Sequence, residues 1–193
     1  MAIGKWLGLA ALFLSVLICG CKGWAPCFPG IVNYHGDGQY KGSQGPYCYV
    51  LDLGEVSFQS NHVYSFRIQG LPSSDYVLEM EVGPVSLPVG TAEHFATNST
   101  VAQTLAKISI QGKGCAFERI GRLGEQPAWW CGIIGIANAK ERGQATYRFD
   151  YSPGGEHVHL HRGTSYVITL SLQPIPDVET TTARILLKGG EWK

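Results

Sequence analysis

The chain has 193 residues, enough for one domain with its own core, and its 15 basic and 15 acidic residues leave no net charge. Because no basic surface field would attract phosphates, we expect no nucleic-acid partner. Charged residues make up only 16% of the chain, whereas glycines number 25 and aromatic residues reach 11%. Low charge with many glycines and aromatic residues is typical of an all-β protein with many turns.

The N-terminal segment has the pattern of an export signal. A short positive region that contains Lys5 is followed by an apolar run over residues 6–18. Such a run is shorter than the roughly 20 residues that a membrane-spanning helix needs, but it fits the apolar region of a signal peptide. We therefore expect residues 1–20 to be a signal peptide.

The residues that follow the apolar run are Leu17-Ile18-Cys19-Gly20-Cys21. This pattern resembles the lipobox of bacterial lipoproteins, in which an aliphatic residue, a small residue and Gly or Ala precede the modified cysteine. The resemblance implies that Cys21 is lipidated, with diacylglycerol on its thiol and palmitate among the acyl chains. It also implies a lipid-anchored protein of the bacterial cell envelope, and Lys22 after the cysteine favours the outer membrane, facing the periplasm.

A Gly- and Pro-rich segment, residues 21–46, is expected to form a tether, so we assign the folded domain to residues 47–193. Once Cys21 is lipidated, four cysteines remain in an oxidising compartment: Cys27, Cys48, Cys115 and Cys131. Of three pairings we favour Cys27–Cys48 and Cys115–Cys131, the latter across a hairpin, although free buried thiols are an alternative. Each bridge would close a loop of about 15 to 20 residues and contribute roughly 3 kcal/mol.

Alternation of apolar and polar residues predicts strands throughout the mature chain. The expected strands include residues 47–54, 63–70, 76–82, 105–112, 129–137, 146–155, 165–173 and 182–190. Turn sequences separate them, and the pattern predicts about nine or ten strands in an antiparallel β-sandwich, immunoglobulin-like or jelly-roll in style. A closed barrel is the alternative. The alternation places Glu79 and Glu81 on the solvated face of their strand. The irregular segment 83–100 is a candidate binding loop.

Three histidines at alternate positions, His157, His159 and His161, are the best candidate for chemistry. On a strand they share one face, where imidazoles can converge on zinc or copper. A further ligand would have to come from another segment, and a solvated strand face that carries three polar rings is the alternative.

Adjacent Trp129 and Trp130 point to opposite faces if their segment is extended, so that one could form an exposed platform for a sugar or a partner. The alternative is a central strand with both rings buried.

Sequence motifs of catalysis, such as a nucleophile elbow or a zinc helix, are missing, so we assign no catalytic residue and no required cofactor. We expect a non-catalytic envelope lipoprotein that binds a protein partner for envelope assembly or toxin immunity. A carbohydrate-binding module and a periplasmic metal-binding protein are the alternatives.

Overall fold

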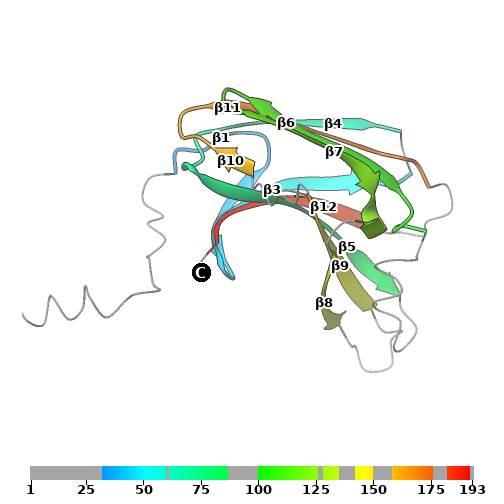
Figure 1. Ribbon diagram of the computed structural model, residues 1–193. Helices are drawn as coiled ribbons and strands as arrows, with labels where there is room; N and C mark the ends of the chain where they lie inside the picture. The colour runs from blue at the N-terminus through cyan, green and yellow to red at the C-terminus, as the bar shows by residue number, and fades with distance from the viewer. Residues whose placement is uncertain are drawn as a thin grey trace, which may run out of the picture.

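The computed structural model describes residues 32–59, 61–86, 100–125, 128–134, 142–149, 158–175 and 182–191. Two antiparallel sheets pack face to face (Figure 1), which confirms the predicted all-β sandwich. A single 3-10 turn, η2 (Leu123–Glu125), accompanies the strands of the described ranges. No helix in these ranges has the length and apolar character needed to cross a membrane.

The smaller sheet has five strands in the order β1-β4-β11-β6-β7. Their bounds are β1 (His35–Gly36), β4 (Val63–Gln69), β11 (Ser165–Leu172), β6 (Leu105–Gly112) and β7 (Cys115–Arg122). On each longer strand one set of alternate side chains faces the core and the other faces solvent, as the period-2 pattern of these segments predicts.

The larger sheet has seven strands, of which six follow the order β2-β3-β12-β5-β9-β8. Their bounds are β2 (Gln39–Gln44), β3 (Tyr47–Ser57), β12 (Thr182–Glu191), β5 (Ser74–Ser86), β9 (Arg142–Arg148) and β8 (Ala128–Ile134). The seventh strand, β10 (Val158–Leu160), pairs with the beginning of β5.

Apolar side chains from both sheets form one hydrophobic core. Leu51, Leu187 and Leu78 form one buried cross-strand row of the larger sheet, and Ile168 and Ile110 are paired in the smaller sheet. Each such side chain contributes about 1.5–3 kcal/mol when it is fully removed from water. The core therefore holds the two sheets together and fixes which face of each sheet is exposed.

Two tyrosine–glycine pairs hold neighbouring strands close together, one in each sheet. Tyr166 of β11 is paired with Gly112 of β6, and Tyr76 of β5 is paired with Gly189 of β12. In both pairs the ring lies where a β-carbon on the glycine would be, so any larger residue would overlap it. Both positions therefore require glycine because only a residue without a β-carbon leaves room for the tyrosine ring. Neither glycine is needed here for a positive φ angle.

The folded domain begins earlier than the predicted boundary at residue 47. β1 pairs with β4, and β2 pairs with β3, although both strands lie in the segment 21–46 that we expected to be a tether. Glycines in this segment serve the pairing itself: Gly42 has a φ of +80° and lies where the β2–β3 register shifts. The twelve described strands exceed the expected nine or ten because β1 and β2 were assigned to the tether and β10 is only three residues long.

The expected hairpin between the strands of Cys115 and Cys131 does not form. β7 pairs with β6 in the smaller sheet, whereas β8 pairs with β9 in the larger sheet. After β7, the turn η2 ends the strand: the Leu123 amide donates to the Thr104 carbonyl and the Gly124 amide to that of Ala102. The chain therefore crosses between sheets where the sequence suggests a simple turn.

Candidate functional site

The histidine segment forms β10 and places its side chains as alternation predicts. Val158 and Leu160 are buried, while His159 lies exposed between them. The register puts His159 opposite Asp75 of β5, and His159 Nδ1 lies 2.7 Å from Asp75 Oδ1. The rings of His159 and His161 meet edge to face, with centroids 4.8 Å apart.

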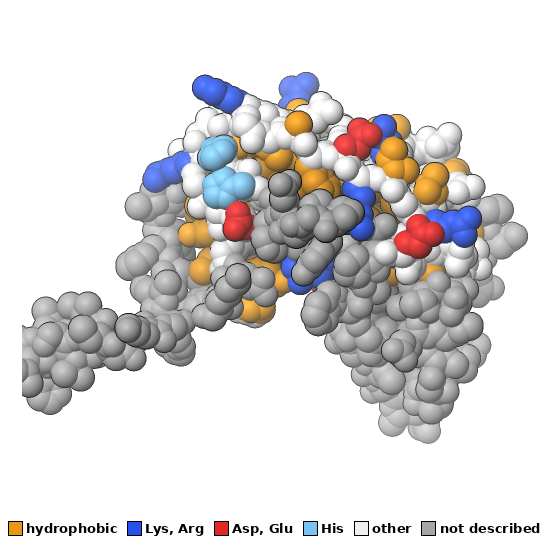
Figure 2. All heavy atoms as spheres, in the orientation of Figure 1, with side chains coloured by type: hydrophobic (Ala, Val, Ile, Leu, Met, Phe, Trp, Pro, Cys, Tyr) orange, Lys and Arg blue, Asp and Glu red, His pale blue; other side chains and the backbone are white. Residues whose placement is uncertain are grey.

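The described part of this segment does not complete a metal site. A carboxylate on Nδ1 would orient the Nε2 of His159 for a ligand, as carboxylate–histidine pairs do in metal sites. However, the described residues contain no group of three histidine, cysteine or carboxylate side chains that could hold a metal ion. His157 lies outside the described residues. What the described geometry provides is an exposed, hydrogen-bonded His159–Asp75 pair beside His161; Figure 2 shows histidines next to an acidic side chain on one face.

The cysteine predictions have different outcomes. Cys115 is a free thiol, so the expected Cys115–Cys131 bridge is wrong; the two strands belong to different sheets. Burial raises the pKa of the Cys115 thiol, whose Sγ lies 4.0 Å from the Ile110 carbonyl oxygen. Cys48 is disulfide-bonded, and its partner is not among the described side chains. The Cys27–Cys48 pairing therefore stays a prediction, and Cys27, like Cys21, lies outside the described residues.

The two tryptophans lie on β8, where Trp129 is paired with Thr146 and Trp130 with Ala145. Their side chains lie outside the described part of the structure. Within the described strands β8 has one neighbour, β9, so it is an edge strand and not the central strand suggested by its apolar sequence. The register shifts between Trp130 and Gly132, which indicates a bulge in this edge.

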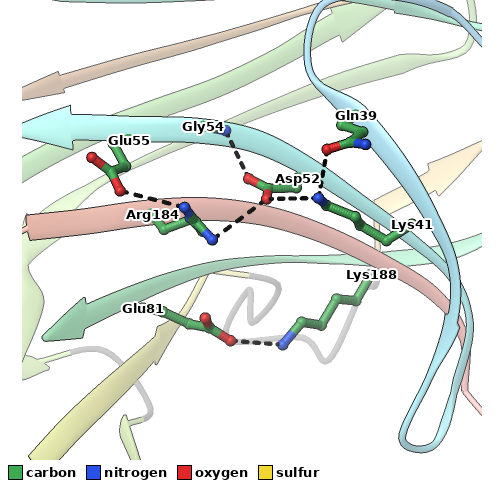
Figure 3. A network of polar contacts seen from close by, with 8 residues as sticks. All are labelled: Gln39, Lys41, Asp52, Gly54, Glu55, Glu81, Arg184 and Lys188. Atoms are coloured by element: carbon green, nitrogen blue, oxygen red, sulfur yellow. Dashed lines mark hydrogen bonds and ion pairs between the residues drawn. The ribbon is translucent and has the colours of Figure 1, made fainter. Parts of the chain in front are cut away.

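A network of ion pairs covers the outer face of the larger sheet (Figure 3). One part links β2, β3 and β12: Asp52 lies 3.8 Å from Lys41 and 3.7 Å from Arg184, and Arg184 also reaches Glu55 at 3.3 Å. Figure 3 shows Lys188 of β12 extending toward Glu81 of β5, where Nζ and Oε1 are 3.2 Å apart. The pairs made by Arg184 and Lys188 join strands that are distant in sequence, so they help fix the register of the sheet.

Glu79 is buried within this network, contrary to the prediction that it is solvated. Its side chain is 6% exposed, and its Oε2 lies 2.6 Å from Lys188 Nζ. Its Oε1 lies 3.7 Å from Arg148 Nε and 3.4 Å from the Tyr47 hydroxyl. Parity correctly placed Glu79 on the outer face, but the neighbouring strands β9 and β12 bring two cations to it, and Tyr47 of β3 brings a phenol.

The pKa of Lys188 reflects this environment. Burial alone would lower it, but the hydrogen bond and negative charge of Glu79, with the charge of Glu81, outweigh burial and raise the pKa above the ordinary lysine value. Lys188 therefore stays charged at neutral pH. Its ammonium group therefore stays available to the buried Glu79 side chain, whose Oε2 lies 2.6 Å away.

The outer face of the smaller sheet carries exposed apolar side chains. Within the described residues three large hydrophobic side chains are exposed: Val63 (60%), Ile120 (56%) and Leu105 (43%). All three alternate with core-facing neighbours on β4, β7 and β6, so all three lie on this outer face. We call this group the apolar end of the smaller sheet.

Cross-strand register shows how close these side chains lie. Paired residues form a row across the four strands β4, β11, β6 and β7: Val63, Ser171, Lys107 and Ile120. Val63 and Ile120 lie at opposite ends of this row, about 14 Å apart. Leu105 precedes Lys107 by two residues on the same face, diagonally beside Ile120. The sequence gives no direct signal for this group, because each residue occupies a polar position of its own strand and only the sheet order brings them together.

Comparison of the chain with models of known protein families finds no match, and comparison with curated proteins finds none either.

Proposed function

We propose that this chain is a non-catalytic lipoprotein of the bacterial cell envelope that binds a protein partner through the apolar end of its smaller sheet. The observation that carries the binding proposal is that Val63, Leu105 and Ile120, the three large hydrophobic side chains exposed in the described residues, all lie at one end of the same sheet face. Isolated exposed apolar residues are normal on a protein surface, whereas grouped ones favour an interaction site. The lipid anchor rests on the lipobox-like sequence that ends at Cys21.

The chemistry around the apolar end suits a protein surface better than a small ligand. Between Val63 and Ile120 the row contains Ser171 and Lys107, and the next row of the face is formed by Ser65, Thr169, Ser109 and Glu118. Ser109 and Thr169 hydroxyl oxygens lie 2.6 Å apart and satisfy each other. The face also carries the exposed ion pair of Lys107 and Glu118, whose charged atoms lie 3.4 Å apart. Small hydroxyls and one ion pair among apolar side chains form the mixed apolar and polar surface that protein interfaces have.

Site-specific photo-cross-linking in intact cells tests the binding site. A benzoylphenylalanine residue at position 63 or 105 should capture a second polypeptide, because both side chains project from the proposed surface. The matched control is position 55, since Glu55 is equally exposed but lies on the larger sheet. Adducts that form equally from position 55, or no adduct from positions 63 and 105, would contradict the proposed surface.

Lipid anchoring has a separate test. A Cys21→Ser variant should move from the membrane fraction to the soluble envelope fraction, because the thioether acceptor is removed. A Cys19→Ser variant is the matched control and should remain membrane-bound. Membrane retention of Cys21→Ser would refute the lipobox interpretation without bearing on the binding surface.

A further inference from the structure

The disulfide of Cys48 joins the folded domain to the segment that precedes it. Cys48 is disulfide-bonded, whereas Cys115 is a free thiol. Cys131 lies on β8, which β12, β5 and β9 separate from β3, so four strand spacings, roughly 19 Å, lie between β3 and β8. A disulfide needs α-carbons no more than about 7 Å apart. The partner of Cys48 is therefore a cysteine that precedes residue 32.

Three cysteines precede residue 32: Cys19, Cys21 and Cys27. In the proposed lipoprotein, Cys19 leaves with the signal peptide and Cys21 carries the lipid, so Cys27 is the partner that the mature chain offers. At most about 20 Å of chain then separates the α-carbons of Cys21 and Cys27. The position of Cys48 in the fold therefore determines which part of the domain is held close to the membrane.

Cys48 lies at the same end of the larger sheet as the His159–Asp75 pair. One row of paired residues crosses β3, β12, β5 and β10: Tyr49, Gly189, Tyr76 and Val158. Because β3 and β5 are both antiparallel to β12, they run in the same direction, and Cys48 and Asp75 each lie one residue beyond this row on the same side. His159, which is paired with Asp75, lies on that side too.

Loops that lead into the smaller sheet complete this end of the sandwich. After β10, residues 161–164 connect to β11, and the His161 ring lies beside the β6–β7 hairpin, since a β-carbon on Gly114 would be 3.2 Å from its Cδ2. The Arg162 amide donates to Ser73 Oγ, in the connection between β4 and β5. In Figure 1, β10 and the connection to β11 lie at the left of the view.

We call this part of the surface the histidine end and define it by its exposed polar residues: Ser73, Asp75, Lys113, His159, His161 and Arg162. Asp75 is hydrogen-bonded to His159, whereas Lys113 and Arg162 form no ion pair with a described residue. Figure 2 shows basic side chains around the histidines. Glu191 also ends β12 here, and its side chain lies outside the described ones. The two basic groups are available to anionic lipid headgroups.

The apolar end of the smaller sheet lies at the opposite end of the sandwich. Leu105 and Gly112 end the eight-residue strand β6, about 24 Å apart, and Gly112 adjoins the hairpin of the histidine end. This length is about equal to the full reach of the chain between Cys21 and Cys27. The apolar end could therefore lie nearer the membrane only if that chain were fully extended, which costs conformational entropy.

We propose that the histidine end rests on the phospholipid headgroups of the membrane that holds the lipid anchor, and that the apolar end points away from them. The inference depends on the proposed lipid anchor and adds the surface of the domain that the membrane covers. It also leaves Val63, Leu105 and Ile120 accessible to a partner beyond the membrane surface.

Fluorescence quenching by lipids tests this orientation. The full-length lipidated chain, in a Cys115→Ser/Cys131→Ser background, carries a thiol-reactive fluorophore at Lys113→Cys and is reconstituted in vesicles of phosphatidylethanolamine and phosphatidylglycerol. Lipids with a nitroxide on the headgroup should quench this fluorophore several-fold more than the same fluorophore at Leu105→Cys, because quenching requires close approach. Leu105 is the matched control, since it is exposed on the same hairpin but at the opposite end of β6.

Flotation of the vesicles separates failure of the anchor from failure of the orientation. If the labelled chain does not float with the vesicles, the anchor is refuted and the inference with it. If the chain floats and position 105 is quenched as much as position 113, or more, the anchor stands and the orientation is wrong.

Peptide mapping without reduction tests the bond from which the inference starts. The peptide that contains Cys48 should be joined to the peptide that contains Cys27. A bond from Cys48 to Cys131 would remove the short connection to the anchor, and a bond from Cys48 to Cys21 would leave no thiol for the lipid. Either bond would overturn the inference.

Discussion

Removal of the Lys188 charge should destabilise the larger sheet because Glu79 would remain buried without its closest cation. Lys188→Met retains most of the apolar stem of the side chain and removes only the ammonium group, 2.6 Å from Glu79 Oε2. Loss of one partner from a fully buried ion pair costs about 3–5 kcal/mol. Here Arg148 and Tyr47 stay near Glu79, and the lysine side chain is 14% exposed, so we expect about 2–3 kcal/mol.

Urea denaturation of the wild type and the variants measures this loss as a change in the free energy of unfolding. Glu55→Gln is the matched control, because it breaks the Arg184–Glu55 pair on the same face while Glu55 is 61% exposed. An exposed pair contributes at most about 1 kcal/mol. The double variant Glu79→Met/Lys188→Met should be more stable than Lys188→Met, since it removes the buried carboxylate together with its closest cation and leaves only the more distant Arg148 contact to be lost.

Two results would refute this reasoning. If Lys188→Met costs no more than Glu55→Gln, the Glu79 carboxylate is hydrated and does not depend on Lys188. If the effects of Glu79→Met and Lys188→Met simply add, the two side chains are not coupled despite their 2.6 Å separation.

Three further predictions follow from single residues. Because the pKa of Lys188 is raised in the fold, its stabilising effect is fully present below the ordinary lysine pKa of about 10.4 and is lost as pH rises through the higher folded value. The wild-type melting temperature should therefore fall more than that of Lys188→Met between pH 9 and strongly alkaline pH; equal falls would contradict this. Gly189→Ala should reduce the free energy of unfolding by about 1–3 kcal/mol in urea titrations, because the methyl group overlaps the Tyr76 ring, whereas Ser65→Ala on the outer face should have little effect. Peptide mapping after alkylation under non-reducing conditions should find Cys115 modified, slowly because burial raises its pKa, and complete protection would mean that it is bonded.

Alternation in the sequence was sufficient to predict the solvent-facing and core-facing sides of many strands. β11 is the clearest example: Tyr166, Ile168 and Leu170 are buried, and the residues between them are not. Such strands face the core on one side and water on the other, so an apolar residue indicates a core-facing side chain and a polar residue a solvent-facing one. The same logic placed His159 on the exposed side of β10 and Val158 and Leu160 inside.

Sheet order could not be predicted, because it depends on which distant segments pair. The sequence from Cys115 to Cys131 resembles a hairpin, but η2 sends the chain into the other sheet and leaves Cys115 without Cys131 as a partner. Asp75 reaches His159 across 84 positions of sequence, so no local pattern indicates their hydrogen bond. The Gly- and Pro-rich composition of residues 21–46 suggested a tether, because composition does not show that Gly42 accommodates a register shift in β2.

The burial of Glu79 was missed for a related reason. Parity assigns a side chain to a face of its strand but does not show which side chains on neighbouring strands will surround it. Lys188 is more than 100 residues away in sequence and becomes a neighbour only because β12 inserts beside β5. The apolar end of the smaller sheet was missed likewise, since its three residues come from three separate strands.

The position of β12 also affects when the protein can fold. β12 lies between β3 and β5, so residues 182–191 supply the middle of the larger sheet, and Tyr47 is paired with Glu191. Contacts between such distant parts of a chain form slowly, because a long loop must close before they contribute. A chain threaded through a membrane pore from its N-terminus could not complete this sheet until residues 182–191 had followed. If the chain is exported as we propose, this strand order would delay completion of the larger sheet until the last strand has crossed the membrane.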